Sequence, residues 1–220
     1  MPAILLEERE LLLCVKPWGV LSEGEGEEAM PALLAKQLGG TIYPVHRLDR
    51  ETGGCMVYAR TKAAAGRLSA LIAQHRMEKE YLAVVAGCPA EECGTLRDLL
   101  YRDAAKNRSY VVDRLRRGVR EAELSYRVLE TVETAQGCYS QLGVRLHTGR
   151  THQIRVQFAS RRLPLVGDRR YGSREESPHM ALWAYELCFP HPFRRETVRV
   201  RSLPPAEWPW TLFHLPTEEP

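Results

Sequence analysis

The sequence predicts an α+β fold built around a central, largely antiparallel or mixed β-sheet, in one continuous domain over residues 1–220. Strand-like and helix-like segments follow one another without the regular strand–helix–strand rhythm of a parallel sheet. Neighbouring strand-like segments recur in pairs, which is typical of hairpins. Apolar residues make up 44% of the 220 residues, which is enough for a sizeable core, and no repeat or low-complexity linker divides the chain.

The first half of the chain is expected to place two helices among four short strands. Apolar runs predict strands at residues 4–6, 11–15, 41–45 and 55–59. The first helix should end at Gly39, because glycine commonly follows a helix; its apolar face is Met30, Leu33, Leu34 and Leu38. The second helix, residues 62–76, carries one apolar stripe of Ala64, Leu68, Leu71 and Ile72.

The second half is expected to consist mostly of strands with one helix. Strands are predicted at residues 79–86, 122–132, 138–146, 180–189 and 197–201, and the helix at residues 151–160. Residues 91–118 mix apolar and turn-forming positions, and we expect either an elaborated loop or a hairpin there.

Two basic segments stand out on a chain whose net charge is only +3. Residues 97–120 contain eight basic and three acidic side chains, and residues 145–174 contain eight arginines and one aspartate. Arginine carries a planar guanidinium group that pairs well with phosphates and base edges. Either these segments are solvated charged faces, or they hold a polyanion along one surface.

The sequence predicts a soluble, cytoplasmic protein without membrane contact. No apolar stretch approaches the roughly 18 residues of a membrane helix. The first ten residues carry three glutamates and one arginine, unlike a signal peptide. No Cys-x-x-Cys pair occurs, and we expect reduced, structural thiols, with neither disulfides nor a zinc site. The six cysteines are Cys14, Cys55, Cys88, Cys93, Cys138 and Cys188.

The first segment that could carry chemistry is residues 46–54, His-Arg-Leu-Asp-Arg-Glu-Thr-Gly-Gly, a charged loop between two apolar strands. Asp49 is flanked by arginines, and nearby positive charge favours an ionised carboxylate. Such a carboxylate can act as a nucleophile or a base. The same residues also fit an aspartate in a salt-bridged turn.

A second such segment, residues 145–155, runs from a strand through a Thr-Gly turn into the predicted helix. On that helix His152, Arg155 and Ala159 are spaced to share a face, and helix N-termini bind anions. The segment therefore suggests either a phosphate or carboxylate contact or arginines on a solvated helix. Residues 78–81, Glu-Lys-Glu-Tyr, place Tyr81 at the start of a strand, where a half-buried core tyrosine is the ordinary interpretation.

Together these segments resemble the RluA-type pseudouridine synthases. Residues 46–54 are similar to the family signature His-Arg-Leu-Asp-x-x-Thr-Ser-Gly, and residues 146–155 to Leu-x-Thr-Gly-Arg-x-His-Gln-Ile-Arg. Four shorter motifs complete the family's order, so the resemblance covers nearly the whole chain. They are Lys-Pro-x-Gly at residues 16–19, Lys-x-Tyr at 79–81, Gly-Asp-x-x-Tyr-Gly at 167–172 and Leu-x-Phe-x-His-Pro at 187–192.

The resemblance implies an enzyme that isomerises uridine to pseudouridine in structured RNA, either tRNA or rRNA. It also implies the pseudouridine synthase fold, with two lobes, flanking helices and an active-site cleft. The bond between the uracil nitrogen and ribose breaks, the base turns, and a carbon–carbon glycosidic bond forms. Nothing is oxidised or hydrolysed, so no cofactor and no metal are expected, and the histidines are interpreted as hydrogen-bonding scaffold.

The site residues follow from the same resemblance. Asp49 would be the catalytic carboxylate at the floor of the cleft, Tyr81 would stack on the flipped uracil, and Arg155 would pair with Asp49. Arg47 would replace the extruded nucleotide in the RNA helix, and Ile154 would pack against the base. The expected substrate-binding residues are Arg47, Ile154, His46, Arg150, His152 and Gln153.

Two positions depart from the family pattern: Gly53 stands where serine is usual, and Met180-Ala181 replaces His-Ala. The chain is also expected to begin directly at the catalytic domain, so RNA capture would rest on the basic segments, and a monomer is the default state. The expected RNA contacts are residues 91–118 with Arg161, Arg162, Arg169 and Arg170.

Two other classes of protein fit part of the pattern. A non-catalytic RNA-binding protein would keep the fold and the basic residues, but it has no need of the trio Asp49, Tyr81 and Arg155. A metal-dependent phosphoester hydrolase could use Asp49, Asp168 and histidines, yet it requires clustered carboxylates. The acidic residues here are dispersed along the chain, and the ordered motifs favour the RNA isomerase.

Overall fold

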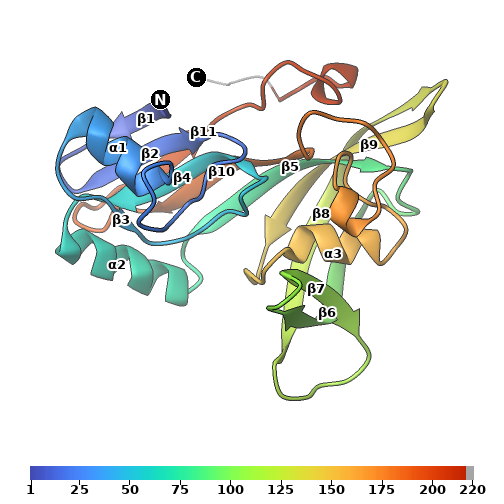
Figure 1. The fold of residues 1–220 in the computed structure, drawn as a ribbon, viewed down its shortest axis with the longest axis horizontal. Helices are drawn as coiled ribbons and strands as arrows, with labels where there is room; N and C mark the ends of the chain where they lie inside the picture. Colours follow the sequence, from blue (N-terminus) through green and yellow to red (C-terminus); the bar gives the residue numbers. More distant parts are fainter. Residues whose placement is uncertain (217–220) are drawn as a thin grey trace. The chain divides into compact units, whose positions relative to one another are not determined.

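The computed structural model describes residues 1–216, which divide into two compact units (Figure 1). Unit 1 comprises Met1–Lys79 and Trp183–Pro204, and unit 2 comprises Glu80–Leu182 and the segment that begins at Pro205. Within each unit the described strands pair in antiparallel fashion, except that β4 (Gly53–Ala59) and β10 (Leu182–Pro190) are parallel. The predicted α+β fold with a mixed, largely antiparallel sheet is confirmed.

The sheet of unit 1 holds four strands side by side, in the order β1 (Ala3–Glu7), β2 (Leu11–Lys16), β4 and β10. Strand β11 (Thr197–Arg201) pairs with β10, and β3 (Tyr43–Pro44) pairs with β4. The strand expected at residues 41–45 is thus reduced to two residues, because Pro44 has no N–H with which to continue the ladder.

Helices α1 (Met30–Leu38) and α2 (Lys62–Ala73) belong to unit 1. Gly39 ends α1 with φ of 75°, as its sequence position predicts. Thr61 begins α2 by accepting a hydrogen bond from the backbone N–H of Ala64 at 3.1 Å. The predicted stripe of α2 packs on the sheet in one core, which includes Ala64, Leu68, Leu71, Leu13, Val57 and Leu187.

The sheet of unit 2 runs in the order β5 (Glu78–Ala86), β9 (Gly137–Leu146), β8 (Val119–Thr134), β6 (Cys93–Asp103) and β7 (Arg108–Val112). Residues 91–118 therefore adopt the hairpin alternative. We call residues 93–118 the arm; its hairpin lies beside α3 (Gln153–Ala159) in Figure 1. Short 3₁₀ helices are η1 (Arg169–Tyr171) and η2 (Trp210–Leu212).

The helix expected at residues 151–160 is shorter than predicted. It begins at Gln153, because His152 lies in the left-handed region with φ of 54°, which ends any helix at that point. His152 therefore does not share a helix face with Arg155, and the shared face with Ala159 that the spacing suggested is wrong. Across residues 1–216, the structure has no helix of the length and apolarity needed to cross a membrane.

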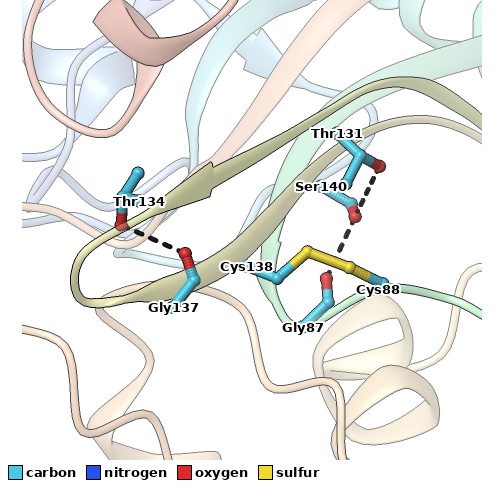
Figure 2. Close-up of a disulfide and its surroundings, with 7 residues drawn as sticks. All are labelled: Gly87, Cys88, Thr131, Thr134, Gly137, Cys138 and Ser140. Carbon is cyan, nitrogen blue, oxygen red and sulfur yellow. Dashed lines mark hydrogen bonds between the residues drawn. A yellow bond between two sulfur atoms is a disulfide. The ribbon is translucent and has the colours of Figure 1, made fainter.

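Cys88 and Cys138 form a disulfide, so the expectation of six reduced thiols is wrong for this pair (Figure 2). Pairing of β5 with β9 sets Ala86 opposite Tyr139, and the N–H of Gly87 donates to the carbonyl of Cys138 at 2.8 Å. This register brings the two cysteine Cα atoms to 6.3 Å, within disulfide range. Cys93 is also not a buried thiol as expected; it is free and exposed in β6.

Removing the cross-link is expected to destabilise unit 2. The disulfide joins residues 50 positions apart, and a cross-link over a loop of that size is worth about 2–4 kcal/mol of unfolding free energy. Urea unfolding of the Cys88→Ala, Cys138→Ala double variant should show a lower midpoint than the oxidised wild type. Cys93→Ala is the matched control and should leave the midpoint unchanged; equal midpoints for the double variant and the wild type would contradict the assignment.

Candidate active site

The loop of residues 46–54, called here the Asp49 loop, lies in unit 1 and leads into β4. Its backbone is held on both sides of Asp49. The hydroxyl of Ser22 donates to the carbonyl of Leu48 at 2.7 Å and accepts from the N–H of the same residue at 3.0 Å. The N–H of Thr52 donates to the carbonyl of Asp49 at 3.0 Å. The loop therefore presents Asp49, which is partly exposed, from a fixed backbone.

Lys16 ties this loop to the turn at residues 16–19. Its side chain is completely buried, and its Nζ donates to the carbonyls of Pro17, Val20 and Arg50 at 2.9, 2.7 and 3.0 Å. Burial lowers the pKa of Lys16 to about 8, against the opposing effect of the charge on Glu51. Three carbonyl acceptors use all three ammonium protons, so Lys16 holds the backbone next to Asp49 from inside the unit.

His46 and Arg47 differ in environment although they are neighbours. His46 Nε2 accepts a hydrogen bond from the N–H of Val57 at 3.1 Å, and burial, aided by the charge on Lys79, holds the pKa of His46 well below its usual range. His46 is therefore a neutral anchor between the loop and β4. The side chain of Arg47 is 61% exposed and pairs with Glu23 at 2.7 Å.

Glycine at residue 53, where the family usually has serine, has a steric reason. A Cβ atom at this position would lie 2.3 Å from the ring of Trp183, and one at Gly54 would lie 2.3 Å from the backbone of Ala184. Both glycines sit where β4 and β10 begin their parallel pairing. A serine at residue 53 would thus require the Trp183 ring to move.

In unit 2 the turn between β9 and α3 is closed by the side chain of Gln153. Its Oε1 accepts from the Thr148 hydroxyl at 2.8 Å and from the N–H of Arg150 at 3.0 Å, and its Nε2 donates to the carbonyl of Glu123 at 3.0 Å. Arg150 is exposed and donates from Nε to the carbonyl of Glu121 at 2.9 Å. Gln153 thus links the turn to β8. Helix α3 has only seven residues, so its N-terminus alone does not support the suggested anion contact.

Arg155 and Asp168 form a buried bidentate ion pair in unit 2. Nε of Arg155 lies 2.7 Å from Oδ2, and Nη2 lies 2.8 Å from Oδ1. The two side chains are 5% and 1% exposed. A fork of two parallel, charge-assisted hydrogen bonds fixes the plane of the guanidinium group as well as its position.

The predicted site residues are divided between the two units. Unit 1 holds Asp49, His46 and Arg47; the members in unit 2 are Tyr81, Arg150, His152, Gln153, Ile154 and Arg155. Tyr81 lies on β5 and is 5% exposed, and Ile154 on α3 is 4% exposed. The pairing of Arg155 with Asp49 stays a prediction.

Sequence reasoning assigned no site function to Lys16 or Tyr171, and it considered Asp168 only for the alternative hydrolase. All three lie in motifs that the family order had already marked, at residues 16–19 and 167–172. That order was the signal that could have found them. Their partners could not be inferred from the sequence, because only the fold brings these residues together. Lys16 bonds to Arg50, Tyr171 to His152 and Asp168 to Arg155.

One group of three potential metal ligands occurs among residues 1–216, Glu8 with His191 and Glu196. His191 Nδ1 accepts from the N–H groups of Phe193 and Arg194 at 3.1 and 3.0 Å. Its proton is therefore on Nε2, which donates to Glu8 at 3.0 Å and leaves no lone pair there for a metal. Glu8 and Glu196 also pair with Arg194. The group is a structural network of ion pairs at the turn between β10 and β11.

Asp49 thus lies on a backbone-fixed loop of unit 1, and Arg155 of unit 2 is held by Asp168 in a buried fork. A carboxylate of this kind can act as a nucleophile or as a base. The sequence pattern of the RNA pseudouridylate synthase family matches residues 10–160. The chain belongs to this family, which makes it an RNA isomerase, and the predicted resemblance is confirmed.

Individual relatives agree with this assignment. An uncharacterised RNA pseudouridine synthase of Synechocystis is 34% identical, with 96% of this chain and 68% of the relative covered. The tRNA pseudouridine synthase C of Vibrio cholerae is 31% identical, with 92% and 91% covered. The ribosomal large subunit pseudouridine synthase D of Xylella fastidiosa is 34% identical, with 93% and 66% covered. The solved structure of human RNA pseudouridylate synthase domain containing 1 matches with a TM-score of 0.80 and 28% identity, covering 93% of this chain and 84% of that one.

Proposed function

We propose that this chain converts uridine to pseudouridine in a cytoplasmic tRNA or rRNA, with Asp49 as the essential carboxylate. The observation that carries the proposal is the fixed backbone of the Asp49 loop. Lys16, Ser22 and the turn to Thr52 hold the residues on both sides of Asp49. A reacting group that is held in place before the substrate arrives spares the reaction the entropy of ordering it.

The other residues would act around this carboxylate. Asp49 would either attack the anomeric carbon of the ribose or assist an elimination there, and Tyr81 would stack on the flipped uracil. Arg155, whose Nε and Nη2 donate to Asp168, would orient Asp49. No cofactor or metal is required by this chemistry.

RNA binding would use side chains that can leave their present partners at little cost. A uridine inside a stem must be flipped out of the stack, which costs a few kcal/mol. Arg47 is exposed, and its ion pair with Glu23 is screened by water, so it can exchange that partner for RNA. We expect it to enter the space that the flipped nucleotide leaves.

Isomerisation replaces the hydrogen on C5 of uracil, so tritium release from RNA labelled at that carbon tests the proposal. Purified full-length protein is incubated with tRNA and with rRNA fragments transcribed with 5-tritiated uridine. Release from either RNA is the expected result. Binding of both RNAs without release from either would contradict the proposal and support the non-catalytic RNA-binding alternative.

The arm is expected to contribute phosphate contacts. Arg114 and Arg117 are exposed in the segment between β7 and β8, and neither has an ion pair with any residue among 1–216. Reversing both charges (Arg114→Glu, Arg117→Glu) should lower RNA affinity about tenfold and reduce the slope of log affinity against log salt by about 2. Lys62→Glu, an exposed position on α2 of unit 1, is the control. Unchanged affinity and salt slope would exclude the arm from the RNA interface.

A further inference from the structure

A small polar cluster in unit 2 joins the arm to the start of α3. The N–H of Ser109, on β7, donates to the hydroxyl of Tyr171 at 2.8 Å. That hydroxyl lies 3.0 Å from Nδ1 of His152. The Ser109 hydroxyl donates to the carbonyl of Thr151 at 2.6 Å. The arm is therefore bonded both to η1 and to the residues that lead into α3.

The direction of the bond between Ser109 N–H and the Tyr171 hydroxyl follows from the atoms present. The Ser109 N–H can only donate, so it uses a lone pair of the Tyr171 hydroxyl. The tautomer of His152 sets the direction of the 3.0 Å bond between that hydroxyl and Nδ1. Burial raises the pKa of Tyr171, so the hydroxyl keeps its proton. His152, in turn, is the left-handed residue that decides where α3 begins.

Tyr171 also contacts the catalytic arginine that the proposed function requires. The guanidinium carbon of Arg155 lies 5.1 Å from the centroid of the Tyr171 ring. The N–H of Tyr171 donates to the carbonyl of Asp168 at 3.1 Å, and Asp168 holds Arg155. Arg170, on the same turn, donates to the carbonyls of Lys106 and Asn107 in the arm at 3.2 and 3.3 Å. The η1 turn thus touches the arm on one side and the Arg155 fork on the other.

We propose that Tyr171 is a positioning residue whose hydroxyl couples the arm to His152 and Arg155. This inference rests on the proposed function of the arm and of Arg155. When RNA fixes the arm, the Ser109–Tyr171–His152 chain fixes the start of α3 and with it the guanidinium group. RNA binding at the arm would then raise the rate of the reaction as well as the affinity.

Tyr171→Phe isolates the hydroxyl, because the ring keeps its packing against Leu100, Ala122 and Val156 and its place beside Arg155. We expect kcat for RNA isomerisation to fall about tenfold, the effect of losing about one hydrogen bond. KM should change less than twofold. Tyr139→Phe is the matched control: Tyr139 lies on β9 of unit 2, outside the arm, and its hydroxyl makes no hydrogen bond within residues 1–216. It should leave both constants unchanged.

The coupling itself is tested by combining Tyr171→Phe with the Arg114→Glu, Arg117→Glu arm variant. With saturating RNA, the arm variant should lower kcat in the wild-type background and have no further effect in the Tyr171→Phe background. Non-additivity of this kind measures the interaction directly. Additive effects on kcat, or a Tyr171→Phe enzyme with wild-type kcat, would overturn the inference.

A readout independent of catalysis separates this inference from the proposed function. In the wild type, the ¹⁵N resonance of His152 Nδ1 should report its hydrogen bond with the Tyr171 hydroxyl, and it should shift in Tyr171→Phe and stay unchanged in Tyr139→Phe. An unshifted resonance overturns the inference even if the enzyme is active. Wild-type protein that releases no tritium, with the resonance shifted as expected, would instead refute the proposed function and leave the hydrogen-bond chain established.

Discussion

Asp49→Asn is expected to lower the rate of pseudouridine formation by on the order of a thousandfold or more, while RNA affinity stays near the wild-type value. Asparagine has the shape of aspartate but lacks its charge and nucleophilic oxygen. The hydrogen bonds that fix the Asp49 loop come from the backbone and from Lys16 and Ser22, so the loop should keep its conformation. Single-turnover kinetics on the RNA that responds in the tritium assay measure the effect.

Glu51→Gln is the control for this prediction. Glu51 lies in the same loop and is exposed, and the proposed chemistry does not use it. The control should retain the wild-type rate. A rate for Asp49→Asn within tenfold of the wild type would show that this carboxylate is not essential.

Asp168→Asn is expected to cause the largest loss of stability among single changes at the site, about 3–5 kcal/mol of unfolding free energy. The substitution removes the carboxylate charge of the bidentate fork that holds the guanidinium group of Arg155, which is 5% exposed. Urea unfolding gives the free energy, and the tritium assay gives the activity. Glu123→Gln, which breaks the exposed ion pair with Arg97, should leave the midpoint close to that of the wild type.

A double variant separates stability from catalysis at this pair. Arg155→Met with Asp168→Asn removes both buried charges, so much of the lost stability should return. Activity should not return, because the arginine proposed to orient Asp49 is gone. A double variant as unstable as Asp168→Asn alone would show that the unbalanced charge is not the cause.

Local chemistry predicted those elements whose signals lie within a few residues. Gly39 marks a helix end in the sequence and ends α1 in the structure. The stripe of α2 and the strand at residues 197–201 were likewise predictable from periodicity. Such features depend on neighbours in the chain. The order of the motifs was sufficient to predict the family.

Features that depend on strand register or on a single backbone angle were not predictable. The disulfide requires β5 and β9 to pair so that Cys88 meets Cys138, 50 positions away. The late start of α3 depends on the left-handed conformation of His152, and a histidine in the sequence does not predict that conformation. The structure pairs Arg155 with Asp168, a partner that the sequence did not indicate. Long-range partners of this kind exist only once the sheet has formed.

The central claim, that this chain isomerises RNA uridine through Asp49, is tested most directly by mapping pseudouridine in total tRNA and rRNA of the source organism with and without its gene. Deletion should remove pseudouridine at one or a few positions. The wild-type gene should restore them, and the Asp49→Asn gene should not. Restoration by the Asp49→Asn gene would contradict the assignment of the catalytic carboxylate, and a map unchanged by deletion would contradict the proposed activity on these RNAs.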